Sequence, residues 1–275
     1  MEYVIINGEI VKKDEAILTS FFWNDPLFIT EKVWFGFGGI PLFDEKLDKL
    51  SKQLQIIGAI TPPLFLNQRE FFRRIKRMLN KNRFYRSGLI HFQLLIAGTE
   101  TNFVLYATPF EQSEFRYHDS GILIRFAENH KFSKSSMLFA DNFTRIFDQV
   151  AFAMIKEPAV QGFIFLNEKG LVCDAGLSNV FFVKKNTLLT PSLATGCIPD
   201  HLRKLIIEAA VNLHLQIIEP EEIIPETVSK MDEIFFAGEV TGIQWVLGID
   251  TKRFVHPVSA QIHNEMNKIL FNKVH

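Results

Sequence analysis

The stretch Asp174-Ala175-Gly176-Leu177-Ser178-Asn179-Val180-Phe181-Phe182-Val183 decides how this chain is interpreted. An acidic residue, a short turn and a Ser-Asn pair precede a run of apolar residues that is typical of a buried strand. Another apolar run, residues 163–166, lies just upstream, and Lys184-Lys185-Asn186 predicts the tip of a hairpin just downstream. The polar residues of the stretch therefore stand between buried strands, where a rigid scaffold can hold a functional site.

The order of the segments that follow is also informative. Leu188-Leu189-Thr190-Pro191 predicts the end of a strand, Gly196-Cys197-Ile198-Pro199 a turn, and residues 200–213 a helix that carries Arg203. This layout resembles the class IV aminotransferase family, which contains branched-chain and D-amino acid aminotransferases and aminodeoxychorismate lyase. The family pattern is an acidic residue, Ser-Asn, a lysine-tipped hairpin, Thr-Pro and Gly-x-x-x-Gly-x-x-Arg. The resemblance is strong over residues 160–205 and weak in the first half of the chain.

The resemblance implies a fold, a cofactor and a reaction. The expected fold is the two-domain α+β fold of the D-amino acid aminotransferase type. A small α+β domain covers residues 1–115, a larger α/β domain covers residues 116–275, and the cleft lies between them. The implied cofactor is pyridoxal phosphate, and the implied reaction is amino group transfer on an amino or keto acid, or the aminodeoxychorismate lyase reaction. Members of this family are expected to be homodimers.

Several residues match positions that bind the cofactor in the family. Asp174 stands where the family places a glutamate beside the pyridine nitrogen, and the alternative is a strand-end aspartate that accepts local N–H bonds. Ser178 and Asn179 match the Ser-Asn pair of the family, whose polar side chains support the cofactor site. Lys49 stands where the family has a helix arginine. The lysine keeps the positive charge but cannot donate the two parallel hydrogen bonds of a guanidinium. Thr241 is the hydroxyl left in a segment where polar side chains help to hold phosphate.

The lysine that must carry the cofactor is not at its expected place. Counting back from the acidic residue leads to residues 142–144, which are Asn-Phe-Thr. Lys134 is the candidate catalytic residue if an insertion brings it into the site, and Lys131 is the other upstream lysine. The alternative, which we favour, is that both are exposed loop lysines, because lysine is mostly exposed in proteins.

The predicted phosphate cup is altered as well. Where the family has Gly-Ile/Val-Thr at the start of the helix, this chain has Asp200, His201 and Leu202. Asp200 is a good N-cap that would accept the helix N–H groups and repel phosphate. Glu239 adds a second carboxylate near Thr241. A second hypothesis follows, in which the chain is a catalytically inactive homologue that keeps the fold as a binding or partner protein.

Composition excludes little and supports a globular protein. The chain has 275 residues, 47% of them hydrophobic, and a formal net charge of −1, so charge gives no case for nucleic acid or an acidic membrane. No uncharged apolar run reaches about 18 residues, so we expect no membrane span. The histidines and two cysteines lack metal-ligand spacing. The N-terminus lacks a signal sequence, so we expect the cytoplasm.

Periodicity predicts the remaining elements. We expect hairpins over residues 4–11 and 33–42, helices from residue 43, over 67–79 and over 144–155, strands at 89–97, 103–108 and 122–126, and a linker at 109–119. The helix over 67–79 carries a basic cluster that we interpret as its solvated face. An anion site is the alternative for that cluster.

Overall fold

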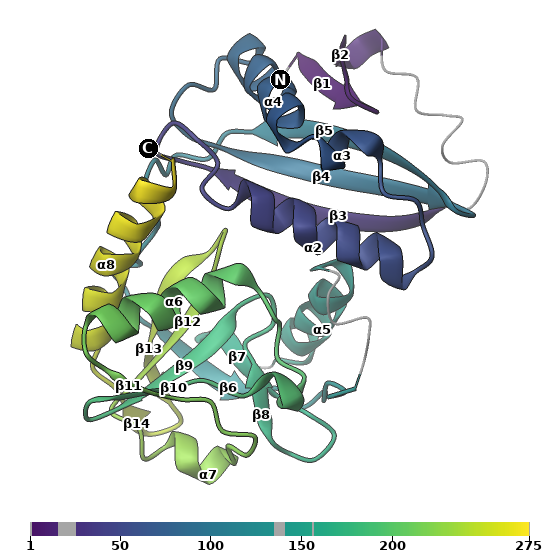
Figure 1. Ribbon diagram of the computed structural model, residues 1–275. Coiled ribbons are helices and arrows are strands. Elements are labelled where there is room, and N and C mark those ends of the chain that lie inside the picture. The colour runs from purple at the N-terminus through teal and green to yellow at the C-terminus, as the bar shows by residue number, and fades with distance from the viewer. Residues whose placement is uncertain (1, 16–25, 135–140, 156, 275) are drawn as a thin grey trace. The chain divides into compact units, whose positions relative to one another are not determined.

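The computed structural model describes residues 2–15, 26–134, 141–155 and 157–274, which form two compact units (Figure 1). Unit 1 contains Met1–Glu114 and Lys273–His275, and unit 2 contains Phe115–Asn272. Each unit combines helices with a sheet, in agreement with the expected α+β class. The cleft expected between the halves stays a prediction.

Unit 1 is built on a five-stranded antiparallel sheet in the order β2-β1-β5-β4-β3. Its strands are β1 (Tyr3–Ile6), β2 (Glu9–Lys12), β3 (Leu27–Phe35), β4 (Gly88–Ala97) and β5 (Glu100–Thr108). Its helices are η1 (Lys13–Glu15), α2 (Phe43–Ile56), α3 (Pro63–Leu66) and α4 (Gln68–Lys81).

The core of unit 1 joins the sheet to α2 and α4. The apolar stripe of α2 includes Leu47 and Leu50, that of α4 includes Phe71 and Ile75, and all four are buried in one cluster with Phe92 of the sheet. The helices therefore form where apolar residues recur at helical spacing, and both are confirmed.

The hairpin predicted for residues 33–42 is wrong. Strand β3 begins earlier, at Leu27, and pairs along its whole length with β4. Only a short Gly36–Gly39 bridge follows it. Phe37 and Gly38 have φ of 52° and 77°, so the chain turns tightly there and continues into α2 instead of returning as a strand.

Unit 2 is built on a nine-stranded mixed sheet in the order β11-β10-β9-β12-β13-β6-β7-β8, with β14 paired to β13. Its strands are β6 (Ile122–Phe126), β7 (Val160–Leu166), β8 (Val172–Asp174), β9 (Asn179–Lys184), β10 (Thr187–Leu189), β11 (Gln216–Ile218), β12 (Glu233–Gly238), β13 (Gly242–Ile249) and β14 (Lys252–Arg253). Its helices are α5 (Asp141–Met154), η3 (Leu193–Thr195), α6 (His201–Asn212), α7 (Pro225–Val228) and α8 (Pro257–Val274), the last of which ends in unit 1.

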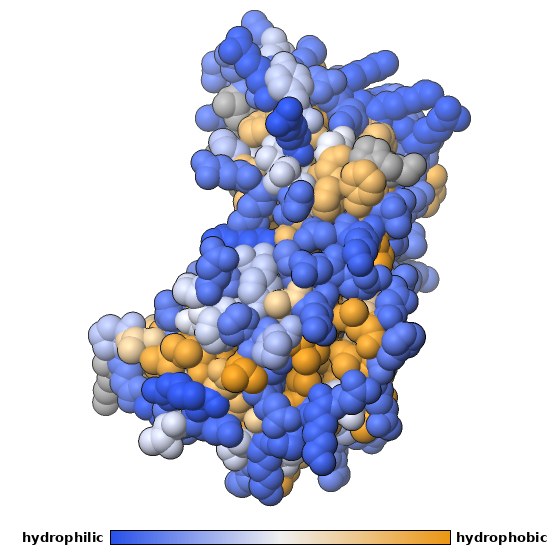
Figure 2. Space-filling model, turned by 90° about the vertical axis from the view of Figure 1, so that its left-hand side faces the viewer, coloured by the Kyte–Doolittle hydropathy of each residue, from blue (hydrophilic) through white to orange (hydrophobic). Residues whose placement is uncertain are grey.

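Both faces of this sheet are covered. Val180 and Phe182 of β9 belong to one core cluster, whereas Phe181 points the other way and stacks on Phe235 at 5.0 Å between ring centroids. Hydrophobic residues also gather on the surface of unit 2 in the view of Figure 2. No helix in the described parts of the chain is long and apolar enough to cross a membrane.

Candidate functional site

The centre of the candidate site is a buried ion pair between Lys131 and Asp174. The Lys131 Nζ donates to both carboxylate oxygens of Asp174, at 2.7 Å and 2.9 Å, and both side chains are 0% exposed. Asp174 ends β8, beside Phe165 of β7. The Lys131 backbone N–H donates to Leu166 O at 2.8 Å, which fixes the lysine at the end of β7. The two segments thus meet because the sheet places them there.

Aromatic and backbone groups surround the pair. The Lys131 ammonium lies 4.9 Å from the centroid of the Phe165 ring, and the Gly176 N–H donates to Asp174 at 3.0 Å. Burial raises the pKa of the Asp174 carboxyl, and the Lys131 ammonium opposes that rise. Good geometry and added hydrogen bonds are what a buried ion pair needs to offset its desolvation.

A second carboxylate, Asp148 of α5, approaches the same turn. Burial raises the pKa of Asp148 to about 6, Lys131 opposes this shift, and the charge of Asp174 adds to it. Gly176 has a φ of +75°, and a Cβ added there would lie 1.9 Å from the Asp148 Oδ1. Only glycine therefore fits this turn with the aspartate in place. Asp148 was not among the predicted site residues, although it stands on the helix predicted to border the site.

The Ser-Asn pair of the motif is buried at the start of β9. Ser178 Oγ lies 3.1 Å from the Thr241 Oγ1, which stands in the turn between β12 and β13. The side chain of Asn179 is 1% exposed, and its Nδ2 has no hydrogen-bond acceptor among the described residues. The structure thus places the hydroxyls of Ser178 and Thr241 side by side, and it leaves the Asn179 Nδ2 as a buried donor without an acceptor among the described residues.

The N-terminus of α6 is capped by the carboxylate of Asp200, the residue just before the helix. Asp200 accepts the Arg203 backbone N–H at 2.7 Å, which confirms the predicted cap. His201 is half-buried and Leu202 is buried in the hydrophobic core. Leu202 is therefore a packing residue in this structure.

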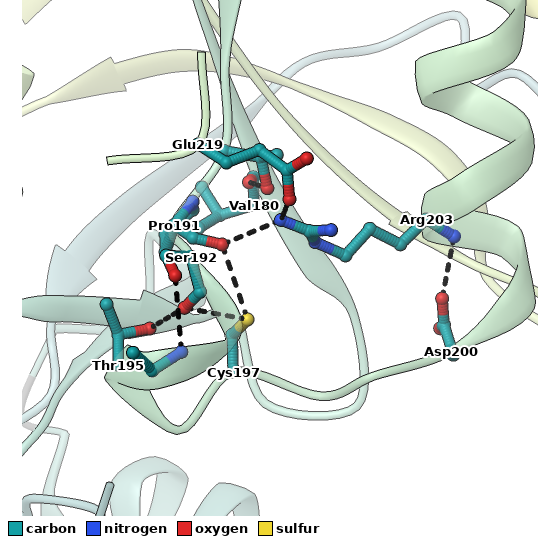
Figure 3. A network of polar contacts seen from close by, with 10 residues as sticks. Val180, Pro191, Ser192, Thr195, Cys197, Asp200, Arg203 and Glu219 are labelled. Carbon is teal, nitrogen blue, oxygen red and sulfur yellow. Dashed lines mark hydrogen bonds and ion pairs between the residues drawn. The ribbon is translucent and has the colours of Figure 1, made fainter. Parts of the chain in front are cut away.

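The side chain of Arg203 supports the loop that precedes α6. Its guanidinium donates to Pro191 O at 2.8 Å and to Glu219 at 2.6 Å (Figure 3). Cys197 Sγ approaches the same carbonyl of Pro191, and Thr195 Oγ1 donates to Ser192 O. Arg203 thus holds the loop before α6 in place through its hydrogen bond to Pro191 O.

Lys49 also has a partner within the chain. The lysine pairs with the Glu31 carboxylate of β3, and Lys46 donates to the same carboxylate at 3.2 Å. Glu31 is 1% exposed, so this ion pair lies under α2 in unit 1. Glu31 was not predicted from the sequence as a partner of Lys49. Its position on the inward side of a strand with alternating burial was the signal that could have indicated a buried carboxylate.

The two upstream lysines differ. Lys134 is exposed in a turn, as we expected of a loop lysine. The expectation of exposure is wrong for Lys131, because the Asp174 carboxylate provides a charge partner in the interior. Of positions 142–144, where the family lysine was expected, Thr144 is buried in α5, and the side chains of residues 142 and 143 lie outside what the structure describes.

Comparison with known proteins identifies the family. The model of the class IV amino-transferase family matches residues 36–249, and the chain belongs to this family. The chain is 23% identical over 98% of its length to the probable branched-chain-amino-acid aminotransferase of Rickettsia bellii, of which it covers 96%. A segment of 22% of the chain is 43% identical to the aminodeoxychorismate lyase of Bacillus subtilis, of which it covers 20%.

Solved structures confirm the fold. The branched-chain amino acid aminotransferase of Thermobaculum terrenum in its pyridoxal phosphate form matches 99% of this chain and 94% of its own, with a TM-score of 0.82 and 17% identity. A putative 4-amino-4-deoxychorismate lyase of Legionella pneumophila matches 88% of this chain and 91% of its own, with a TM-score of 0.74 and 16% identity. The expected class IV fold is therefore confirmed.

The described residues do not fit pyridoxal phosphate in the manner that the family resemblance implies. The acid should face the pyridine nitrogen and the lysine the opposite end of the ring, but Lys131 and Asp174 touch directly. The Arg203 N–H in the first turn of α6 donates to Asp200, and Lys49 pairs with Glu31. The Asp174 carboxylate, one N–H at the start of α6 and the Lys49 ammonium are therefore each engaged by another group of this chain.

Proposed function

We propose that this protein keeps the class IV aminotransferase fold without pyridoxal phosphate-dependent amino transfer, and that it acts as a binding or partner protein. The observation that carries the proposal is the buried pair of Lys131 and Asp174. The ammonium neutralises the carboxylate that the pyridinium of a bound cofactor would need. Removing either partner would leave a buried charge, so entry of a cofactor at Asp174 is opposed by the free energy of the pair.

Two further carboxylates support the proposal. Asp200 accepts an N–H at the N-terminus of α6, the end of a helix that otherwise attracts phosphate. Glu31 pairs with Lys49 and Lys46 in unit 1. A dianionic phosphate would have to displace each carboxylate or bear its repulsion.

A covalent labelling experiment tests the loss of cofactor attachment. The purified protein is mixed with pyridoxal phosphate, its visible spectrum is recorded, and borohydride is added before peptide mass spectrometry. We expect no stable imine absorbance and no pyridoxyl group on Lys131. Specific labelling of Lys134, with loss of colour and of amino transfer in Lys134→Ala, would overturn the proposal. That result would favour the alternative, amino transfer on an amino or keto acid or a lyase-type reaction.

A pair of substitutions tests the role of the α6 start separately. Asp200→Gly with Leu202→Thr restores the residues that the family pattern has there. We expect tighter binding of inorganic phosphate or of pyridoxal phosphate, measured by calorimetry, because the Arg203 N–H becomes free and the negative charge at the helix start is removed. Asp200→Asn, which keeps a cap without the charge, is the matched control. Unchanged affinity in the double variant would contradict the argument about Asp200.

We also infer that the protein is a cytoplasmic homodimer. Helix α5 leaves several large apolar side chains exposed in the single chain, which a second copy would bury; they are Ile146, Val150, Phe152 and Met154. Cys173 and Cys197 are buried free thiols, which suits a reducing compartment. Light scattering coupled to size-exclusion chromatography measures the oligomeric state, and Val150→Glu should shift it toward monomer.

A further inference from the structure

We propose that the outer face of α4 is a docking surface for an acidic helix of a partner protein. Residues 68–86 contain eight of the chain's 30 basic residues and a single acidic residue, whereas the whole chain has a net charge of −1. This segment therefore concentrates positive charge in a chain that is nearly neutral overall. A helix face exposed to water usually carries both positive and negative side chains, so the excess of positive charge in this segment needs another explanation.

Six of these eight basic side chains lie on α4, and the structure divides the six into two groups. Arg74 donates to Glu70 and to Gly8 O, and Lys76 donates to Gly38 O, so these two side chains hold α4 to the rest of unit 1. The other group is exposed, lies at four-residue spacing along α4 and is called the basic row here; it consists of Arg69, Arg73, Arg77 and Lys81.

The basic row has little negative charge beside it. Arg73 lies 3.8 Å from Glu70, a distance at the limit of an ion pair, and Lys81 lies over the ring of Tyr3. Among the described residues no carboxylate is within ion-pair distance of Arg69 or Arg77. Exposed guanidinium groups of this kind remain available to an external anion.

Geometry and charge select an acidic helix as the occupant. Successive members of the row are about 6 Å apart along the axis, the same rise that separates carboxylates at four-residue spacing on another helix. Guanidinium forks pair with carboxylates in bidentate fashion. Exposed Leu66 and Tyr85 lie before and after α4, at 75% and 65% exposure, and supply apolar contacts at both ends of the row.

Two other polyanions fit less well. A nucleic acid-binding domain is generally basic overall, whereas this chain has an isoelectric point near 6.7. An anionic membrane favours a helix with an apolar face toward the lipid, whereas the apolar stripe of α4, which includes Phe71 and Ile75, is buried in unit 1.

A binding experiment with defined probes tests the proposal. The probe is a fluorescent alanine-based helical peptide with glutamate at every fourth position, and the same peptide with glutamine is its control. Anisotropy measured on the full chain at low salt should show binding of the glutamate peptide only. Arg73→Glu with Arg77→Glu should weaken this binding at least about tenfold. Lys169→Glu with Lys204→Glu, an equal change of charge at exposed sites of unit 2, should leave it within about twofold.

Several outcomes would overturn the proposal. Equal binding of the glutamine peptide would show that charge does not select the partner. Tighter binding of a single-stranded oligonucleotide or of phosphatidylserine vesicles would assign the row to a different polyanion. No binding of any probe would leave the row as a solvated face. Circular dichroism melting of both double variants verifies that each one is folded.

Discussion

Replacing Lys131 with methionine should show how strongly the buried pair holds unit 2 together. Methionine keeps most of the apolar volume of the lysine stem and removes the ammonium, so the Asp174 carboxylate stays in a fully buried site without its charge partner. Breaking a buried ion pair in this way costs about 3–5 kcal/mol. For a domain of the size of unit 2, each kcal/mol lowers the melting temperature by about 2–4 °C. We expect a decrease of about 6–20 °C at pH 7.5.

The pH dependence of the stability of Lys131→Met should show that the unpaired charge of Asp174 causes the loss. Burial already raises the pKa of Asp174, and the loss of Lys131 removes the charge that opposes this rise. A carboxyl whose folded pKa is raised stabilises the fold at low pH and loses that contribution as the pH rises through the folded pKa. The destabilisation of Lys131→Met should therefore shrink on acidification.

A double variant is the control for this prediction. Lys131→Met with Asp174→Asn removes both charges and keeps an acceptor for the Gly176 N–H. It should recover most of the lost free energy of unfolding, measured by urea titration. If Lys131→Met alone costs less than about 1 kcal/mol, or if Asp174→Asn brings no recovery, the reasoning about a buried charged pair is wrong.

Three further predictions concern the same unit. Gly176→Ala should destabilise the protein by more than about 1 kcal/mol, because the added Cβ meets Asp148 at a positive φ; a neutral effect in a thermal melt would contradict this. Asp148→Asn should stabilise the protein at pH 7.5 by on the order of 2 kcal/mol and have little effect at pH 4. The reason is that the raised pKa of about 6 makes the charged form unfavourable at higher pH, and equal effects at both pH values would count against it. Asp200→Ala should cost about 1 kcal/mol in urea titrations through loss of the cap, and Asp200→Asn should restore most of it.

Much of the fold could be predicted because its signals are local. The apolar stripes of α2 and α4 and the Asp200 cap depend on neighbours within a few residues, and the structure has all three. The 33–42 hairpin failed because a pair of glycines predicts a turn but does not say which strand will pair with the one before it. Pairing of β3 with β4 depends on residues about sixty positions away in the sequence.

The site could be predicted only in part. The motif pointed to Asp174, Ser178 and Asn179, and the structure has all three buried, with Ser178 Oγ beside Thr241. The position of Lys131 could not be predicted, because burial of a lysine depends on a carboxylate that only the folded sheet places beside it. The same is true of Lys49, whose partner Glu31 belongs to a different element.

The sheet of unit 2 also determines when this unit can form during synthesis. Strand β6 lies between β7 and β13, and β9 pairs with β12, so its central strands have partners from the last part of the chain. The sheet cannot be completed until residues up to Arg253 have left the ribosome. Such long-range pairing slows folding and leaves strand edges exposed for longer. The antiparallel sheet of unit 1 needs only residues up to Thr108, so a nascent chain can assemble that sheet while β12 and β13 are still unmade.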